Sequence, residues 1–189
     1  MNQPKKPTPQ MGAAASLFDY VEMFVLAAVV VVLILTFAFR ICVVSGGSMN
    51  QTLKNGEKLL VSDLFYTPKA GDIIVFHQTS EIDDRFNEPI VKRVIATGGQ
   101  HVKIDYDAKK VYVSDDADFS EDELIDESQY AYFSSGKWLL RGATEYEVPK
   151  GHLFVLGDNR NDSADSRDAR VSFVDERRVL GRVLFRIAG

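Results

Sequence analysis

One uninterrupted apolar stretch near the N-terminus stands apart from the rest of the chain. From Met23 to Phe39 it contains no charged residue and a single polar side chain. A helix that crosses a bilayer core of about 30 Å needs roughly 20 apolar residues, and the stretch reaches that length once its flanks are included. We therefore predict a transmembrane anchor at residues 17–40. Residues 1–16, which begin with a run rich in Pro, Lys and Gln, are predicted to be a disordered tail.

A cleavable secretory signal is the alternative interpretation of this stretch, because Lys5 and Lys6 resemble its positively charged start. Such a signal has an apolar core of about 7–15 residues, followed by small residues at the cleavage site. The core here is longer, and Phe39-Arg40-Ile41 is a poor cleavage site, so the sequence favours an uncleaved anchor. The lysines before the span favour a cytoplasmic N-terminus and an extracytoplasmic domain at residues 41–189, which places the chain in the cell membrane as a single-pass protein.

Beyond the span, apolar residues come in short runs rich in Val, Ile, Leu and Phe, separated by Gly, Pro and Asp. This pattern is typical of strands, and only a turn or two near Glu121–Ser128 suggests a helix. We therefore predict a mainly β fold, in which the N-terminal helix precedes an ectodomain built on a curled antiparallel sheet; Ile41–Val44 either lies at the membrane interface or begins a strand. The predicted strands are Lys58–Val61, Asp72–Phe76, Ile90–Ile95, His101–Ile104, Lys110–Val113, Lys137–Leu140, Leu153–Leu156 and Val179–Ile187.

The charge of the chain argues against one class of partner. It carries 22 basic and 27 acidic residues, a formal net charge of −5. Nucleic acid is therefore not an expected partner, because phosphate binding needs a basic surface. The single cysteine, Cys42, cannot form an internal disulfide.

Carboxylates gather in two segments, Thr79–Glu88 and Asp115–Glu127, and the second holds eight of them and no basic residue. Part of the second segment matches four ligand positions of a calcium loop, but Glu121 stands where that loop needs glycine for its sharp turn. We therefore interpret the second segment as a solvated surface insertion and predict no metal site.

Ser48 is the first candidate nucleophile. It lies in Val44-Ser45-Gly46-Gly47-Ser48-Met49, eight residues beyond Arg40. The two glycines give the backbone freedom, and neighbouring N–H groups could form an oxyanion hole. A serine hydroxyl still needs a base, and a Gly-Gly-Ser segment taken alone is more often only a turn.

Lys92 is the most interesting candidate base, because it lies inside the apolar segment Pro89–Ile95. Strand alternation places it on one face with Ile90 and Val94, where partial desolvation would lower its pKa and make a neutral amine available. The alternative is an edge-strand lysine that points to water, and position alone favours that alternative. None of the three histidines has a paired aspartate motif to mark it as a base. We therefore interpret them as structural or surface residues: His77, His101 and His152.

A third cluster of polar residues runs from Gly157 to Arg167, after the predicted strand Leu153–Leu156. A turn explains its Gly, Asp and Asn residues but explains Ser163, Asp165 and Arg167 less readily. Asp165 and Arg167 are spaced to share one face of an extended strand, where an ion pair could fix the loop.

Four segments resemble, in kind and in order, the motifs of type I signal peptidases, the leader peptidase family. They are Ser-Gly-Gly-Ser-Met-x-x-Thr-Leu at Ser45–Leu53, Gly-Asp-Ile-Ile-Val-Phe at Gly71–Phe76, Val-Lys-Arg-Val-Ile at Val91–Ile95, and Gly-Asp-Asn-Arg-x-x-Ser-x-Asp-Ser-Arg at Gly157–Arg167. The single span and short length are similar to the Gram-positive form. Residues 100–148 carry no motif and are interpreted as a variable insertion between the catalytic motifs.

The resemblance implies a membrane-bound serine endopeptidase, with a fold of the signal-peptidase type, that removes N-terminal signal peptides from exported preproteins. It needs no cofactor, no metal and no obligate protein partner beyond its substrates and the lipid bilayer. Ser48 would be the nucleophile and neutral Lys92 the general base. Ser163 would orient the lysine amine, Asp165 and Arg167 would form a structural pair, and Asp158 would begin the supporting loop.

The resemblance also implies shallow apolar pockets that accept small side chains, as in small-x-small cleavage motifs. The residues at the matching positions are Val44, Met49, Leu53 and Val91. Three departures concern loop details. Asn50-Gln51-Thr52 replaces a common x-Pro-Thr, Ala96–His101 replaces a Gly-x-Pro-Gly-Asp turn, and Gly46 replaces a serine that supplements the oxyanion hole in some members. Backbone N–H groups, chiefly that of Ser48, must then form the hole.

Two alternatives remain at this point. A related Ser-Lys peptidase could cleave itself or one specialised substrate, whereas a non-catalytic anchored β-domain could use its acidic loops to bind a partner. A binding domain has no need for Ser48, Lys92 and Ser163 together, which favours a peptidase.

Overall fold

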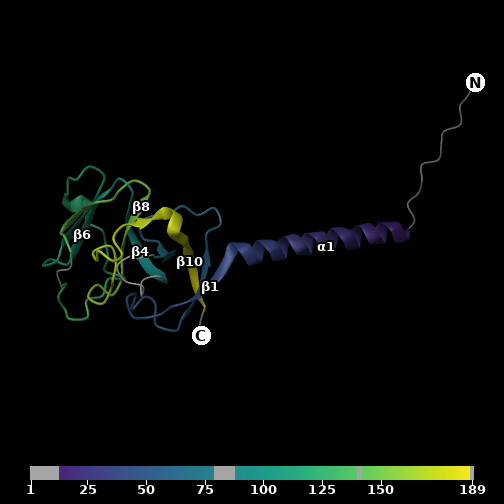
Figure 1. Cartoon of the computed structure of the whole chain (residues 1–189), viewed down its shortest axis with the longest axis horizontal. Helices are drawn as coiled ribbons and strands as arrows, with labels where there is room; N and C mark the ends of the chain where they lie inside the picture. Colours follow the sequence, from purple (N-terminus) through teal and green to yellow (C-terminus); the bar gives the residue numbers. More distant parts are fainter. Residues whose placement is uncertain (1–12, 79–87, 140–141, 188–189) are drawn as a thin grey trace, which may run out of the picture. The chain divides into compact units, whose positions relative to one another are not determined.

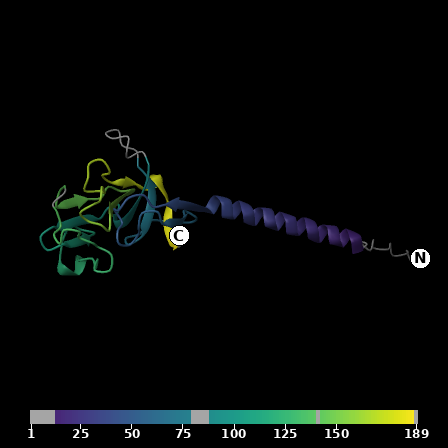
Figure 2. The same ribbon diagram turned by 90° about the horizontal axis from the view of Figure 1, so that it is seen from below.

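The computed structural model describes residues 13–78, 88–139 and 142–187 (Figures 1 and 2). The chain divides into one unit that ends at Ala38 and a second that begins at Phe39. The first unit contains helix α1, and the second contains every strand. Of the first acidic segment, Thr79–Glu88, only Glu88 belongs to the described residues.

Helix α1 runs from Ala13 to Ala38 and is long and apolar enough to cross a membrane. It begins inside the predicted tail because the alanines at its start favour the helix strongly, whereas residues 1–12 lie outside the described part of the chain. It ends two residues earlier than predicted because Phe39 already pairs as a strand with Ser62. Its large apolar side chains point outward on all sides, as expected of a helix that needs an apolar surrounding.

The second unit is built on two antiparallel sheets (Figure 1). The larger sheet has seven strands in the order β1-β2-β10-β3-β4-β8-β9, and the smaller has three in the order β6-β5-β7. Register shifts in β10 and β4 bend the larger sheet into a curled half-barrel. The strands are β1 (Phe39–Val43), β2 (Lys58–Ser62), β3 (Ile73–His77), β4 (Pro89–Thr97), β5 (His101–Asp105), β6 (Lys110–Ser114), β7 (Glu145–Glu147), β8 (His152–Leu156), β9 (Val174–Asp175) and β10 (Val179–Ile187). The described residues also form two short 3-10 helices, Glu121–Glu123 and Glu176–Arg178.

The predicted mainly β fold is confirmed, and all but one of the predicted strands are present. The prediction of a strand at Lys137–Leu140 is wrong for residues 137–139, and Leu140 lies outside the described part. The Asn161 side chain bonds this backbone instead of a neighbouring strand. It donates to the Lys137 carbonyl at 2.7 Å and accepts from the Leu139 N–H at 3.0 Å. Strand β1 settles the open choice for the segment after the span.

Three buried apolar clusters fill the second unit. One packs Val44, Met49 and Leu53 against the larger sheet, a second lies between β3, β4 and β8, and the third joins the smaller sheet to β8. Strand β4 runs through the interior of the larger sheet, paired with β3 on one side and β8 on the other. A polar side chain on β4 is therefore withdrawn from water on both flanks.

Candidate active site

Ser48 lies in the irregular segment that joins β1 to β2. Hydrogen bonds between Val44 and the segment's far end close its base, at 2.8 Å each with Glu57 and Gly56. Met49, directly after the serine, is buried, and its carbonyl accepts the Leu53 N–H at 2.8 Å. The side chain next to Ser48 therefore anchors the turn in the core and leaves the hydroxyl half-buried at the surface.

Lys92 lies at the centre of β4, opposite Ile74 of β3, with only 2% of its surface exposed. Its Nζ lies within hydrogen-bond distance of Ser48 Oγ, at 2.8 Å, and donates to the Val91 carbonyl at 2.9 Å. Burial lowers the lysine pKa from 10.5 to about 8, although the carboxylates of Asp165 and Asp158 oppose the shift. An edge-strand lysine that points to water is therefore excluded.

The loop from Gly157 to Arg167, which we call the catalytic loop, contacts the backbone at Ser48. The Asn159 N–H donates to the Ser48 carbonyl at 3.0 Å, and its Nδ2 donates to the Gly47 carbonyl at 3.1 Å. Gly157 permits this approach, because a Cβ there would overlap both the Ser48 carbonyl and the Ser163 hydroxyl. The Ser48 N–H itself has no acceptor among the described residues, so it can donate to a substrate oxygen.

Asp158 organises the interface between the catalytic loop and β4. It is fully buried and accepts two hydrogen bonds from Arg93, at 2.8 and 2.7 Å. Thr52, from the segment that carries Ser48, donates to the same carboxylate at 2.5 Å. Asp158 thus joins the segment that carries Ser48, strand β4 with Lys92 and the catalytic loop itself. The sequence marked Asp158 but gave no sign of Arg93 or of the contact with Thr52.

The predicted ion pair between Asp165 and Arg167 is present, with donor–acceptor distances of 2.8 and 2.7 Å. The two residues do not share the face of an extended strand, however, because they lie in a tight turn. Asp165 also accepts the Gly157 N–H at 3.0 Å, and Arg167 donates to the Arg160 carbonyl at 2.8 Å. The pair therefore closes the loop on itself.

None of the histidines is placed to act as the base. His77 is exposed at the end of β3, while His101 and His152 are half-buried at the starts of their strands. Within the described ranges, none of the three forms a hydrogen bond to Ser48 or Lys92. In the same ranges, no group of three or more His, Cys, Asp or Glu side chains is placed to hold a metal ion.

Comparison with known proteins identifies the group to which this arrangement belongs. The sequence model of the family described as "Signal peptidase, peptidase S26" matches residues 17–188. The chain belongs to this family. The chain is 32% identical over 173 residues to a signal peptidase I of Bacillus licheniformis, covering 90% of this chain and 88% of the relative.

A probable signal peptidase I-1 of Synechocystis sp. is 29% identical over 174 residues, covering 89% of this chain and 81% of the relative. A crystal structure of a signal peptidase I from Enterococcus faecalis is 29% identical, with a TM-score of 0.44 over 64% of this chain and 98% of that one. The chain is a serine hydrolase of the signal peptidase family.

Ser163 forms no hydrogen bond with Lys92 among the described residues, although the resemblance implies that it orients the lysine amine. The two hydrogen bonds of Lys92 go to Ser48 and to the Val91 carbonyl, and neither involves Ser163. The Ser163 hydroxyl is buried, packs against Gly157, and has no hydrogen-bond partner among the described residues. The orienting role of Ser163 therefore stays a prediction.

Residues 127–139 contact the catalytic loop and form what we call its cradle, which no motif in the sequence predicts. Glu127 binds the fully buried guanidinium of Arg160 through two contacts of 2.5 Å. Tyr132 donates to the Asp158 carbonyl at 2.7 Å and accepts the Arg160 N–H at 2.9 Å. The Trp138 ring covers Arg160 at 5.1 Å from the guanidinium carbon. The prediction that the segment Asp115–Glu127 is wholly solvated is therefore wrong at Glu127, which is 8% exposed.

The four residues predicted to line substrate pockets belong to one apolar cluster next to Ser48. Three of them are buried and the fourth, on β4, is half-buried against them. The structure therefore brings together the residues Val44, Met49, Leu53 and Val91. Their part in substrate recognition stays a prediction.

Proposed function

We propose that this chain is a membrane-anchored endopeptidase that removes N-terminal signal peptides from exported preproteins through a Ser48–Lys92 dyad. The observation that carries the proposal is the 2.8 Å approach of the Ser48 hydroxyl to the amine of a buried lysine whose pKa is lowered to about 8. An ordinary surface lysine, with a pKa of about 10.4, would offer almost no neutral amine at neutral pH. Burial makes the same side chain a usable base.

In the acylation step, the Ser48 hydroxyl donates its proton to the neutral Nζ of Lys92, and Oγ attacks the scissile carbonyl. The ammonium that forms then protonates the leaving amine, so that an acyl-enzyme remains. In the second half, neutral Lys92 takes a proton from water, and the resulting hydroxide attacks the acyl carbon. The bond to Ser48 Oγ breaks, Lys92 returns the proton to Oγ, and the signal-peptide fragment leaves with a free carboxyl group. The lysine thus alternates between base and acid, as histidine does in the Ser-His-Asp triad.

The developing oxyanion needs a donor near Ser48. The serine's own N–H has no acceptor among the described residues, and the two bonds from Asn159 to the carbonyls of Gly47 and Ser48 fix the adjoining peptide planes. A donor fixed before the reaction stabilises negative charge without reorganisation. Asn159 is in this account a positioning residue.

Substrate selection would follow from the apolar cluster beside Ser48. An extended substrate segment would add along the sheet, with small side chains before the scissile bond directed to Val44, Met49, Leu53 and Val91. Helix α1 would cross the membrane with the N-terminus in the cytoplasm and the second unit outside. Enzyme and preprotein would then meet at the same membrane surface.

The test is cleavage of a model preprotein with a small-x-small site by the full chain, by Ser48→Ala and by Lys92→Ala, across pH 6 to pH 10. Loss of either side chain is expected to lower turnover by at least about 10³-fold, because the members of a catalytic unit act together. Wild-type turnover is expected to rise with pH as Lys92 loses its proton. Near-normal turnover by Lys92→Ala would disprove the dyad.

A further inference from the structure

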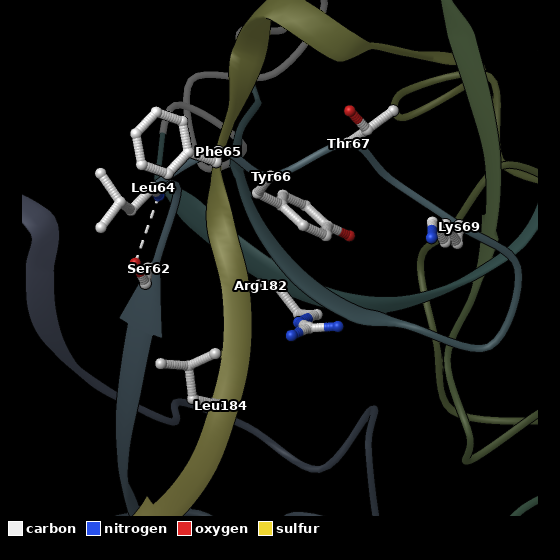
Figure 3. Close-up of a pocket in the computed structure, with 8 residues that line it drawn as sticks. All are labelled: Ser62, Leu64, Phe65, Tyr66, Thr67, Lys69, Arg182 and Leu184. Carbon is white, nitrogen blue, oxygen red and sulfur yellow. Dashed lines mark hydrogen bonds between the residues drawn. The ribbon is translucent and has the colours of Figure 1, made fainter.

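A pocket of about 280 Å³ lies outside the active site, between the loop that follows β2 and strand β10 (Figure 3). This volume is near the lower end of small-ligand pockets, which begin at about 300 Å³. Tyr66 and Arg182 occupy its centre, whereas Leu64 and Phe65 lie to one side and Lys69 to the other in this view. Neither Ser48 nor the catalytic loop contributes to its lining.

Two apolar side chains at the rim are exposed to an extent unusual for a stable surface. Phe65 is 98% exposed and Leu64, directly before it, is 50% exposed. Phe65 also holds a positive φ of 51°, which is unfavourable for a bulky residue. The loop therefore adopts a strained backbone conformation that presents a large apolar ring outward. Such strain is expected where the ring enters an apolar phase.

The wall of the pocket supplies positive charge beside these apolar residues. The Arg182 guanidinium is about half exposed and lies 5.6 Å from the Tyr66 ring. Asp72 holds it at 3.6 Å and also accepts the Tyr66 hydroxyl at 2.9 Å. The exposed Lys69 also lines the pocket, so the two cations of the lining outnumber the one carboxylate, Asp72, that contacts Arg182.

The pocket lies at the end of the second unit where the chain arrives from the apolar helix. Ser62, which lines the pocket, pairs with Phe39, and α1 ends one residue earlier, at Ala38. Arg40 and Asp63 form an ion pair at 3.5 Å beside the same loop. If α1 spans the bilayer, Phe39 emerges at the bilayer surface. Phe65 follows Ser62, the strand partner of Phe39, by three residues.

We propose that this pocket binds the phosphate of an anionic membrane phospholipid, with Arg182 and Lys69 contacting the headgroup and Leu64 and Phe65 entering the acyl region. The inference rests on the membrane anchor of the proposed function. Cations flanked by exposed apolar side chains match the two layers of a bilayer surface, where each basic residue contributes roughly fivefold to affinity for anionic lipid. The site would fix the second unit at the membrane surface.

Insertion of the loop is tested with Phe65→Trp in the full chain, reconstituted in phosphatidylcholine nanodiscs with acyl-brominated lipid. The only native tryptophan, Trp138, is 4% exposed and serves as a constant background. The new tryptophan is expected to emit at shorter wavelength than a tryptophan exposed to water, and to be quenched by the brominated acyl chains. Emission typical of water, without quenching, would overturn the proposal.

The headgroup is tested in phosphatidylcholine discs that carry no other brominated lipid, by adding a small fraction of brominated phosphatidylglycerol or, for comparison, the same fraction of brominated phosphatidylcholine. We expect excess quenching by the anionic lipid that corresponds to about fivefold local enrichment per basic residue, and a fall of about fivefold in Arg182→Gln, which keeps Lys69. Arg177→Gln is the matched control, because Arg177 is also an exposed arginine paired with an aspartate but lies outside the pocket. Lys69→Gln provides a second variant if Arg182→Gln does not fold.

The remaining outcomes identify what has failed. Equal quenching by both lipids would overturn the anionic headgroup, and loss of the excess on adding millimolar inorganic phosphate would assign the pocket to a free anion. Preprotein cleavage is measured on the same samples. Normal cleavage without quenching would reject this site alone, whereas cleavage that is unaffected by Ser48→Ala would reject the proposed function.

Discussion

Ser48 and Lys92, the two members of the proposed dyad, meet at 2.8 Å, yet the protein positions them by different means. Lys92 is fixed by a regular sheet, since β4 is paired on both sides and burial of the lysine follows from that pairing. Ser48 lies in an irregular segment, and its backbone is held by Asn159 in a loop more than a hundred residues away. That loop is held in turn by the cradle.

The difference separates two properties of the site. The chemistry of the base depends on desolvation, which a sheet interior supplies without specific polar partners. The geometry of the nucleophile depends on a chain of buried polar contacts, each of which is costly to break. Changes in the sheet should therefore alter the pH dependence, whereas changes in the cradle should alter turnover and stability at constant pH dependence.

Glu127→Ala is expected to have the largest effect on stability. It leaves the Arg160 guanidinium, which is 0% exposed, without its carboxylate, and we expect a loss of about 3–5 kcal/mol in the free energy of unfolding. Denaturant titration measures this loss, and turnover should fall with it because the catalytic loop relaxes. Asp122→Ala removes an exposed charge from the same acidic segment and should change stability by less than about 0.5 kcal/mol. Equal effects of the two variants would show that the cradle contributes nothing specific.

Lys92→Met tests the other half by its effect on stability against pH. The pKa of Lys92 is about 8 in the folded protein against an ordinary value of 10.5, so between these values the unfolded state binds more protons than the folded state. Wild-type stability is therefore expected to rise with pH across this window, by about 3 kcal/mol in total. Denaturation of both proteins from pH 7 to pH 11 should show this rise in the wild type only. Parallel curves would mean that the folded protein does not depress the pKa.

Asn159→Ala tests the contact between the catalytic loop and the segment that carries Ser48. The variant keeps the backbone bond to Ser48 but loses the side-chain bond to Gly47, so the peptide plane that carries the Ser48 N–H loosens. We expect turnover to fall by about 10- to 100-fold, with KM and the pH midpoint unchanged, because misplacement alone has effects of this size. Steady-state kinetics at several pH values measure both. A shifted midpoint would show that Asn159 acts on Lys92 instead.

Ser163→Ala is expected to have the smallest effect on stability. The hydroxyl is buried without a partner among the described residues, so its removal should leave the free energy of unfolding unchanged or raise it by up to about 1 kcal/mol. Turnover then decides between two roles, because a serine that orients the lysine amine during the reaction must lower it when lost. Turnover within about twofold of wild type would remove Ser163 from the site.

Seven of the eight predicted strands are present because short apolar runs have a local signature, whereas Lys92 has none, since its position alone favoured a lysine that points to water. Short apolar runs between turn residues predicted the sheet, and motif resemblance joined Ser48 to Lys92 across 44 residues. The strand at Lys137–Leu140 was misassigned because a short apolar run cannot show that Asn161, a side chain distant in sequence, bonds its backbone.

The cradle could not be predicted for a different reason. Glu127 is one of eight carboxylates in its segment, and nothing local distinguishes it from the exposed ones. Its burial depends on Arg160, which lies 33 residues further on, just as Asp158 depends on Arg93 at a separation of 65. Pairings of this kind are set by the tertiary fold and leave no periodic pattern.

The central claim is that the sheet interior turns Lys92 into a neutral base beside Ser48. Titration of the Lys92 side chain, followed by the 13Cε chemical shift in the folded full chain, tests it most directly. We expect a midpoint near pH 8, matched by the midpoint of turnover against pH. A midpoint near 10.5, or a turnover profile that does not follow the titration, would contradict it.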